Sequence, residues 1–420
     1  MSTMPANHRQ ILFVSPFFWP EAISTGKYNT CLVEALAAKG NTVDVVTSHP
    51  FYPAWKPLVS HSTLSGVRIH RAGGSVRYPK AILLRRLVLE LWFACYSVWK
   101  TWKLRRGLEQ VIVVFPPSLF AVLVNRIFPS SIHKLGIVHD FQATLGFTDG
   151  GLAKRAFSRI VHAIETIAFR SCHRIIVLSN AMAEQAVQDY GLDSENISVC
   201  YPFISVNITD HLQTRLADLF TENAQHVVYS GALGKKQNSF QLLEVFRAAA
   251  VRLPDVHFHL FSKGPVFDEL RRLYLADPVG RIHFHDLVAD RDLEELYLRS
   301  SVQIIPQEPC ASSACLPSKL PNILAAGTVI LAICAAGCEL ATLLAQTGTA
   351  IVADNWQMDL LVERLQEALL LDRLLTKKQR RAMTAGFLSR TFSLDLLIRT
   401  CDPVLGVSTE NSLTAPLLEV

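Results

Sequence analysis

Short, almost continuously apolar segments alternate with longer helical segments along most of this 420-residue chain. Apolar runs of this length, separated by helices, are typical of parallel strands that are buried on both faces. A polar, irregular stretch at residues 205–225 interrupts the alternation, which then restarts. The predicted strands are residues 11–15, 43–47, 67–71, 111–115, 135–139, 175–179 and 197–201 before that stretch, and 227–230, 256–261, 282–285, 302–305, 329–333 and 350–352 after it.

Two such series predict two α/β domains, each a doubly wound sheet resembling the Rossmann fold. We place the first domain at residues 1–205, the second at 226–392, and a C-terminal helix and tail at 393–420. Ligands of open α/β sheets bind beyond the carboxyl ends of the strands. Two such domains facing each other would therefore enclose a ligand cleft.

Composition narrows the class of protein. Half of the residues are hydrophobic, which excludes disorder, and a net charge of +5 is too small to indicate nucleic-acid binding. The nine cysteines show neither CxxC pairs nor a zinc-finger pattern, so we expect reduced thiols and no metal site. No signal peptide and no run of about 20 apolar residues is present, which predicts a cytoplasmic protein with at most peripheral membrane contact.

The segment 316–327, LPSKLPNILAAG, is the most informative stretch of the chain. It places Ser318 and Lys319 at the predicted start of a helix, residues 317–326, directly before an apolar strand. Free N–H groups and the positive end of the helix dipole make helix starts phosphate sites. The segment therefore suits a diphosphate, although an ordinary capped helix with a solvated lysine would show the same pattern.

Two further loops of the second half follow predicted strands. Residues 231–238, GALGKKQN, combine two glycines with Lys236, which could neutralise a diphosphate oxygen opposite Lys319. The spacing does not match a Walker A loop, and two solvated lysines would look the same. Recognition of a nucleotide base is expected from backbone near Gly264 and Leu287.

The first half offers two candidate sites at strand ends. In the loop after the first strand, Glu21, Gly26, Lys27 and Tyr28 surround a helix start that could receive a negative group of a donor or an acceptor. Further on, His139-Asp140 ends a strand. A histidine or carboxylate there could act as a base or bind sugar hydroxyls, but a capping aspartate beside a half-buried histidine needs no chemistry.

Residues 80–106 are a candidate for membrane contact, unlike the ligand-binding loops described above. Their apolar run, residues 87–99, is too short to cross a bilayer but long enough to lie in its interface. Basic residues crowd both flanks and would contribute about 1 kcal/mol each near an anionic leaflet. A buried helix with basic ends is the alternative. The membrane contacts predicted are Arg85, Arg86, Trp92, Trp99 and Lys103.

Taken together, these motifs resemble retaining glycosyltransferases of family 4, which have the GT-B fold, and most closely those of colanic-acid and related exopolysaccharide biosynthesis. The resemblance covers most of the chain. Its most specific motif is the LPSKLPN run at 316–322. The other motifs that carry it are FWPE at 18–21, GKY at 26–28, PFYP at 50–53, HDFQ at 139–142, YSG at 229–231 and GKKQ at 234–237.

The resemblance implies that the second half holds a UDP- or GDP-sugar through Lys236, Ser318 and Lys319, with Asn322 on the sugar or ribose. It further implies metal-free transfer with retention of configuration, and a C-terminal helix that returns to the first domain. The acceptor would be a lipid-diphosphate-linked saccharide on the cytoplasmic face of the plasma membrane. No cofactor is expected beside the nucleotide sugar as co-substrate.

The chain departs from the family pattern at two places, one of which is Ser262, where a glycine is common. Many members carry two glutamates eight positions apart, where this chain has Ala314 and Asn322. The departure leaves open a catalytically inactive relative that binds saccharide or acts as a scaffold. A soluble nucleotide-sugar 2-epimerase is a third hypothesis, which residues 80–106 disfavour.

Overall fold

The computed structural model describes residues 8–21, 23–142, 152–209, 213–308 and 316–402. The chain divides into two compact units. The first takes in the chain up to Leu178, Ala183–Cys200 and the residues from Leu394 onward, and the second takes in Ser179–Met182 and Tyr201–Ser393. Ala314 of the second unit lies outside the described residues.

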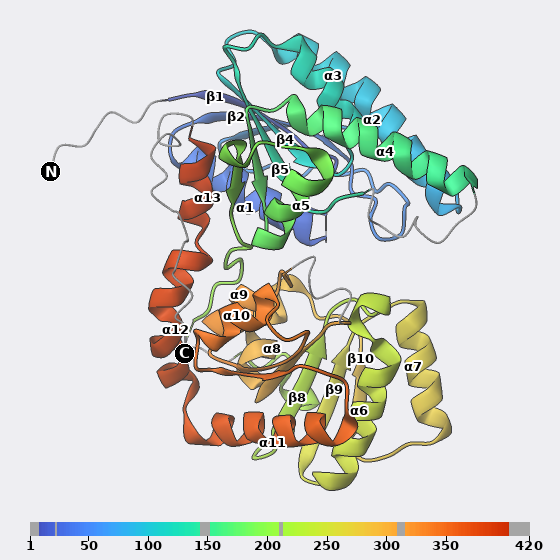
Figure 1. Cartoon of the computed structure of the whole chain (residues 1–420), viewed down its shortest axis with the longest axis vertical. Coiled ribbons are helices and arrows are strands. Elements are labelled where there is room, and N and C mark those ends of the chain that lie inside the picture. The colour runs from blue at the N-terminus through green and yellow to red at the C-terminus, as the bar shows by residue number, and fades with distance from the viewer. Residues whose placement is uncertain (1–7, 22, 143–151, 210–212, 309–315, 403–420) are drawn as a thin grey trace, which may run out of the picture. The chain divides into compact units, whose positions relative to one another are not determined.

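The first unit is built on a seven-stranded parallel sheet in the order β3-β2-β1-β4-β5-β6-β7 (Figure 1). Strand β1, third in this order, is paired on both sides, with β2 and with β4. The strands are β1 (Gln10–Val14), β2 (Thr42–Ser48), β3 (Val67–Ala72), β4 (Gln110–Phe115), β5 (His133–Val138), β6 (Arg174–Val177) and β7 (Ile197–Val199). The helices are α1 (Ser24–Ala38), α2 (Ile82–Leu104), α3 (Leu119–Ile127), α4 (Leu152–Arg170), α5 (Asn180–Tyr190) and α13 (Leu394–Cys401).

Helix α13 joins this unit from the far end of the sequence. Gln110 Nε2, at the start of β4, donates a hydrogen bond of 2.6 Å to the Cys401 carbonyl oxygen. Arg9 and Asp402 form an ion pair of 2.8 Å. The C-terminal helix therefore returns to the first unit, as the sequence predicted.

The second unit is a six-stranded parallel sheet in the order β10-β9-β8-β11-β12-β13. Its strands are β8 (Gln225–Ser230), β9 (Val256–Phe261), β10 (Ile282–His285), β11 (Val302–Pro306), β12 (Val329–Ile333) and β13 (Ala350–Ala353). Its helices are α6 (Ser239–Arg252), α7 (Pro265–Ala276), α8 (Leu293–Arg299), α9 (Leu320–Ala325), α10 (Glu339–Ala345), α11 (Met358–Leu374) and α12 (Lys377–Thr391).

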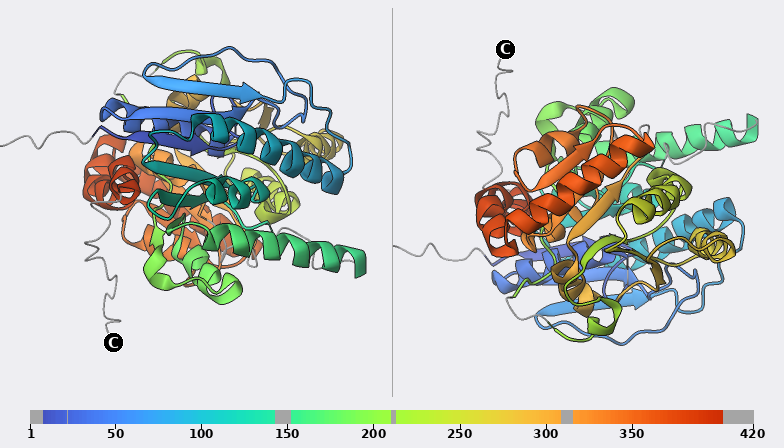
Figure 2. Two further views of the ribbon diagram at one scale, coloured as in Figure 1. Left: turned by 90° about the horizontal axis from the view of Figure 1, so that it is seen from above. Right: turned by 90° about the horizontal axis from the view of Figure 1, so that it is seen from below.

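Strand β12 is apolar at every position because both of its faces are buried. Val329, Leu331 and Ile333 pack into one apolar core, and Ile330 and Ala332 into another. Because successive side chains of a strand point to opposite faces, a strand covered by helices on both sides needs no polar position. The two further views show helices on both faces of the strands in each unit (Figure 2).

The start of α9 corrects the sequence-based prediction. We expected a helix over residues 317–326, but α9 begins at Leu320 and ends at Ala325. Pro321 has no N–H to donate to the carbonyl of Pro317, so a helix cannot run through both residues from that point. Pro321 lies in the first helical turn instead, where no such bond is required.

Candidate functional site

The second sheet has a topological switch point between β8 and β11. The chain adds β9 and β10 on one side of β8, then returns to add β11, β12 and β13 on the other. Connections at such a point leave opposite faces of the sheet, and open α/β sheets bind their ligands there, beyond the carboxyl ends of the strands. Ser230 is the last residue of β8 and marks this position.

Lys319, in the turn before α9, reaches the switch point. Its Nζ donates a hydrogen bond of 3.0 Å to the Ser230 carbonyl oxygen and lies 4.3 Å from the centre of the Tyr229 ring. An ammonium has three donors, and within the described chain this one has a single oxygen acceptor. Burial lowers the pKa of Lys319 to about 7. An anion would supply the acceptors and the charge that this group needs.

Lys377 provides a contrast within the same unit. Burial also lowers the pKa of Lys377 to about 7. Its Nζ, however, donates to Ser300 O at 2.7 Å, to Thr328 Oγ1 at 3.0 Å and to Tyr297 O at 3.3 Å. All three donors of Lys377 are used inside the protein, so the position of Lys377 is structural, whereas Lys319 Nζ has one oxygen acceptor among the described residues.

Two glycines keep space open beside Lys319 and at the next strand end. Gly231 follows β8 with φ of 149°, and a Cβ built on it would lie 3.8 Å from Lys319 Nζ. Gly264 precedes α7 with φ of 104°, and a Cβ built there would meet no atom within 4 Å. Because L side chains rarely adopt such φ values, both loops are suited to close approach by a ligand.

The remaining residues predicted on the donor side are placed as follows. Lys236 is exposed in a short 3-10 turn after β8, and its carbonyl oxygen accepts from Glu308 N at 2.9 Å. Ser318 is half-buried beside Lys319, and Leu287 is exposed after β10. Contacts of these residues with a nucleotide sugar stay predictions.

Asn322 performs a role that the sequence did not suggest. Its side chain is 5% exposed, and Oδ1 accepts hydrogen bonds from the backbone N–H of Ser205 (2.8 Å) and Val206 (3.1 Å). Its Nδ2 donates to Ser205 Oγ at 3.2 Å. Asn322 thus anchors the chain that enters the second unit, and its contact with ribose or sugar stays a prediction.

Glu21 is a buried carboxylate of the first unit, in the loop between β1 and α1. Its two oxygens accept from the backbone N–H of Phe51 (2.9 Å) and Tyr52 (3.0 Å). Burial raises the pKa of Glu21 to about 7, against the lowering effect of those two bonds. Gly26 in α1 packs on Glu21, since an added Cβ would lie 3.1 Å from the glutamate Cβ.

Glu21 therefore holds the backbone of residues 51–52 in place through two hydrogen bonds. Tyr28 is buried and Lys27 half-buried in α1. The predicted acceptor contacts of these residues, and the diphosphate contact of Gly26, are not tested by this geometry and stay predictions.

His139 and Asp140 directly follow β5, as predicted. Burial lowers the pKa of His139 to about 4, so its imidazole is neutral at pH 7. Asp140 Oδ1 accepts from Phe141 N at 3.0 Å. The charge of Asp140 raises the pKa of Arg86, although burial, the largest effect, and Arg85 lower it. Arg86 is thus electrostatically coupled to the predicted catalytic pair.

Arg86 also lines an apolar pocket in the first unit. The pocket has a volume of about 90 Å³ and lies among Leu87, Glu90, Leu119 and Ile160. The Glu90 carboxylate accepts from the backbone N–H of Ser118 and Leu119 at the start of α3. The pocket therefore has one polar end near Arg86 and Glu90 and otherwise apolar walls.

The five predicted membrane contacts on α2 differ in their exposure to solvent. Trp99 and Lys103 are exposed, with Lys103 Nζ 3.9 Å from the Trp99 ring centre. Trp92 is half-buried: its indole Nε1 donates to Tyr78 Oη at 2.9 Å and its ring fills the space over Gly73, so its membrane contact stays a prediction. Arg85 and Arg86 are half-buried, and Arg85 stacks on Trp55 at 4.5 Å.

The exposed face of α2 is instead an apolar stripe, which we define as Leu84, Leu87, Leu91, Cys95, Trp99 and Trp102. These positions are spaced three or four residues apart, so they share one face of the helix. The opposite face buries Leu89, Phe93 and Ala94 against α3. Within the described chain, no helix has both the length and the apolar character needed to cross a bilayer.

Comparison with known proteins decides the family. Residues 25–207 match the family model described as Glycosyltransferase Family 4, and residues 215–386 match the model described as Glycosyl transferases group 1. The chain is 26% identical over 381 residues to the protein named colanic acid biosynthesis glycosyl transferase WcaI of Escherichia coli K12, covering 86% of this chain and 92% of the relative. The chain belongs to the GT-B glycosyltransferases of family 4.

Solved structures agree on the fold of this glycosyltransferase. It matches WaaG, a glycosyltransferase involved in lipopolysaccharide biosynthesis, with a TM-score of 0.69 at 14% identity, over 94% of this chain and 100% of the other. It matches sucrose-phosphate synthase from Thermosynechococcus elongatus with a TM-score of 0.68 at 17% identity, over 93% and 96% of the chains. At these identities the likeness concerns the GT-B fold alone.

The sequence did not reveal two features of this glycosyltransferase. Arg86 was assigned to a membrane, and its electrostatic interaction with Asp140, which is 54 residues away in the sequence, appears only in the folded chain. A histidine array on β8, β9 and β10 was also missed, although His257-Phe-His259 and His283-Phe-His285 alternate at strand spacing. That alternation places each pair on one face of its strand.

Proposed function

We propose that this glycosyltransferase transfers a sugar, with retention of configuration, from a UDP- or GDP-sugar to a lipid-linked saccharide in exopolysaccharide biosynthesis of the colanic-acid type. The name of the WcaI relative supports the pathway class. The proposed site of action is the cytoplasmic face of the plasma membrane.

The observation that carries the proposal is Lys319 at the switch point of the second sheet. Its ammonium is desolvated, and within the described chain it has one carbonyl acceptor. A departing nucleoside diphosphate gains negative charge as its bond to the sugar breaks. An ammonium already fixed in a water-poor site stabilises that charge without reorganisation, which is the largest electrostatic contribution such a site can make.

The open loops at Gly231 and Gly264 support the same assignment. Gly231 follows β8, which borders the switch point, and Gly264 follows the neighbouring strand β9; both leave room for atoms of a ligand near backbone N–H groups. The donor diphosphate would lie between the Gly231 loop and Lys319. Lys236 would contribute a second positive charge from the turn after β8.

The apolar stripe of α2 supports a lipid-linked acceptor. Trp99 and Trp102 are each more than half exposed and lie beside the cationic groups of Lys103 and Arg105. Amphipathic aromatic rings with adjacent basic groups favour the headgroup region of an anionic membrane. Such binding would hold the acceptor-binding unit at the surface where lipid-linked saccharides are found.

The deciding experiment measures nucleotide release and sugar transfer with the purified full-length chain. UDP- and GDP-sugars are offered with membrane extracts that contain lipid-linked saccharides. We expect transfer from one donor, and a loss in kcat/KM of about 100-fold or more in Lys319→Met. Lys378→Met, which removes an exposed lysine of α12, is the matched control and is expected to stay within about twofold of the wild type.

Equal activity of Lys319→Met and Lys378→Met would overturn the assignment of Lys319. Saccharide binding without nucleotide release from any donor would favour an inactive relative that binds saccharide. Release of free nucleotide with epimerised sugar would favour a 2-epimerase.

A further inference from the structure

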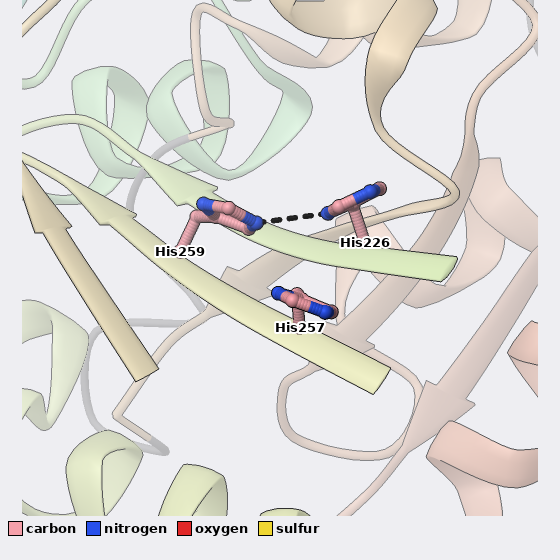
Figure 3. A group of neighbouring side chains, drawn as sticks. All are labelled: His226, His257 and His259. Carbon is pink, nitrogen blue, oxygen red and sulfur yellow. Dashed lines mark hydrogen bonds between the residues drawn. The ribbon is translucent and has the colours of Figure 1, made fainter. Parts of the chain in front are cut away.

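Five histidines lie on one face of three neighbouring strands in the second unit. His226 is on β8, His257 and His259 are on β9, and His283 and His285 are on β10. The register pairs His226 with His257 and His259 with His283, so the rings are brought together by the ladder itself. Three of them, His226, His257 and His259, each offer a nitrogen atom within 4.8 Å of the other two (Figure 3).

The hydrogen bonds of His226 fix the state of its ring. Its Nε2 lies 3.0 Å from the Thr221 carbonyl oxygen, which can only accept, so Nε2 carries the hydrogen. Burial, the largest effect, lowers the pKa of His226 and keeps the ring neutral. Nδ1 therefore has a free lone pair, and it points at His259 Nε2 from 2.9 Å.

The other two rings are held in the same manner. His259 Nδ1 is 3.0 Å from His285 Nε2, and His257 Nδ1 is 3.1 Å from His283 Nε2. In His257 one ring nitrogen is engaged by an outer partner, and Nε2 remains. His259 Nε2 donates its hydrogen to His226 Nδ1, so binding of an ion would replace that hydrogen bond and leave the ring hydrogen of His259 on Nδ1, facing His285. Metal-binding histidines almost always have this arrangement, in which the nitrogen that does not bind the ion is held by a second group.

The distances suit a tetrahedral ion after small movements. Zinc–nitrogen bonds of about 2.0–2.1 Å at a tetrahedral angle separate two ligand nitrogens by about 3.3 Å. His226 Nδ1 and His259 Nε2 would have to part by roughly 0.4 Å from their present 2.9 Å. His257, the most exposed of the three, would move by up to about 1.5 Å, which rotation of its side chain supplies.

The burial and the ligand type of the three histidines indicate which class of metal ion would bind. His226 and His259 are nearly inaccessible to solvent, and the Phe220 ring lies 5.0 and 4.9 Å from their ring centres. Burial lowers the pKa of all three histidines, so they are neutral, ligand-competent imidazoles at pH 7. A site of nitrogen ligands without carboxylates suits zinc and its first-row neighbours and does not suit Mg²⁺ or Ca²⁺.

We propose that His226, His257 and His259 form a binding site for Zn²⁺ or a chemically similar divalent transition-metal ion, with one coordination position left for water. This departs from the expectation of a chain without a metal site. The site is separate from the donor site, because His226 and Ser230 are four residues apart on β8, about 13 Å in an extended strand. The ion would tie β8 to β9 at their amino ends and stabilise the sheet, and it would take no part in sugar transfer.

The experiment uses the full-length chain without a polyhistidine tag, treated with chelator and returned to metal-free buffer. Zn²⁺ binding is measured by titration calorimetry, and Co²⁺ is added as a spectroscopic probe. We expect one ion per chain, a d–d spectrum of nitrogen and water ligands without a thiolate charge-transfer band, and a rise in Tm of about 5–10 °C at 100 times Kd.

His257→Asn tests the assignment, because this ring is half-buried and its loss leaves β8 intact. Affinity is expected to fall by 10-fold or more. His61→Asn, at an exposed position of the first unit, is the matched control and is expected to bind as the wild type does. Circular dichroism of both variants confirms that they are folded.

Absence of stoichiometric binding at micromolar Zn²⁺ would overturn the proposal and leave the array as a hydrogen-bonded network of neutral imidazoles. Unchanged affinity in His257→Asn, or a thiolate band with Co²⁺, would overturn it as well by placing the ion elsewhere, for example on cysteines. Nucleotide-sugar transfer is expected to survive in His257→Asn, so the outcome is independent of the proposed function.

Discussion

Lys319 should take up a proton when a nucleotide sugar binds. Burial holds its pKa at about 7 in the free protein, so at pH 8 roughly nine tenths of the molecules have a neutral amine at this position. A diphosphate placed against the amine favours the ammonium form. Binding at pH 8 should therefore consume close to 0.9 proton per nucleotide sugar, and binding at pH 6 only about 0.1.

The coupling between proton uptake and binding also determines how the affinity for the nucleotide sugar depends on pH. If only the ammonium form binds the diphosphate, the apparent affinity at pH 8 is reduced about 11-fold relative to pH values well below 7, a cost of about 1.4 kcal/mol. UDP-glucose and GDP-mannose are suitable probes, because their diphosphates do not titrate in this range. Titration calorimetry at pH 8 in two buffers of different ionisation enthalpy gives the proton uptake directly.

Two variants separate Lys319 from other titrating groups. Lys319→Met should bind more weakly at pH 6 and show no proton uptake at pH 8. Lys236→Met removes an exposed charge from the turn after β8 and should retain the uptake even if affinity falls. Wild-type uptake near zero at pH 8, or equal uptake in Lys319→Met, would refute the reasoning.

Three further predictions concern stability and the membrane. Glu21 has a folded pKa of about 7, above the unfolded value of 4.5, so its contribution to stability is full below pH 4.5 and is lost as pH rises through 7. Glu21→Gln does not titrate and keeps one of the two side-chain acceptors. In urea unfolding, the difference in free energy of unfolding between wild type and Glu21→Gln should therefore move in favour of the variant by on the order of 1–2 kcal/mol from pH 4.5 to pH 8, and an equal difference at both pH values would exclude this cause. Asn322→Ala removes the side-chain oxygen that accepts hydrogen bonds from two backbone N–H groups and should lower the free energy of unfolding by about 1–3 kcal/mol. An altered donor KM with unchanged stability would instead assign Asn322 to the sugar. Trp99→Ser combined with Trp102→Ser should weaken sedimentation with anionic vesicles by about tenfold or more, with the inward-packed Trp92→Phe as control, and unchanged sedimentation would contradict an interfacial role for α2.

The sequence by itself determined the strands and their parallel arrangement. Every position of β12 is apolar, and only a strand covered on both faces tolerates that pattern. The LPSKLPN run also singled out the lysine that lies at the switch point, because its residue types are chemically suited to a diphosphate wherever the helix begins. Pro321 also argued against a helix that begins at residue 317, because a proline is best accommodated in the first helical turn.

Tertiary structure decided what each polar side chain contacts. Asn322 and Lys319 are three residues apart in one motif, yet Asn322 holds the backbone at Ser205 and Val206 while Lys319 extends to the end of β8. In the same way α2 turns Trp92 inward and leaves Trp99 exposed. Periodicity specifies which face a residue occupies, whereas the partner on that face comes from a segment that can be more than 100 residues away. Desolvation and pKa depend on that partner, so they follow from the packed structure and not from the local pattern.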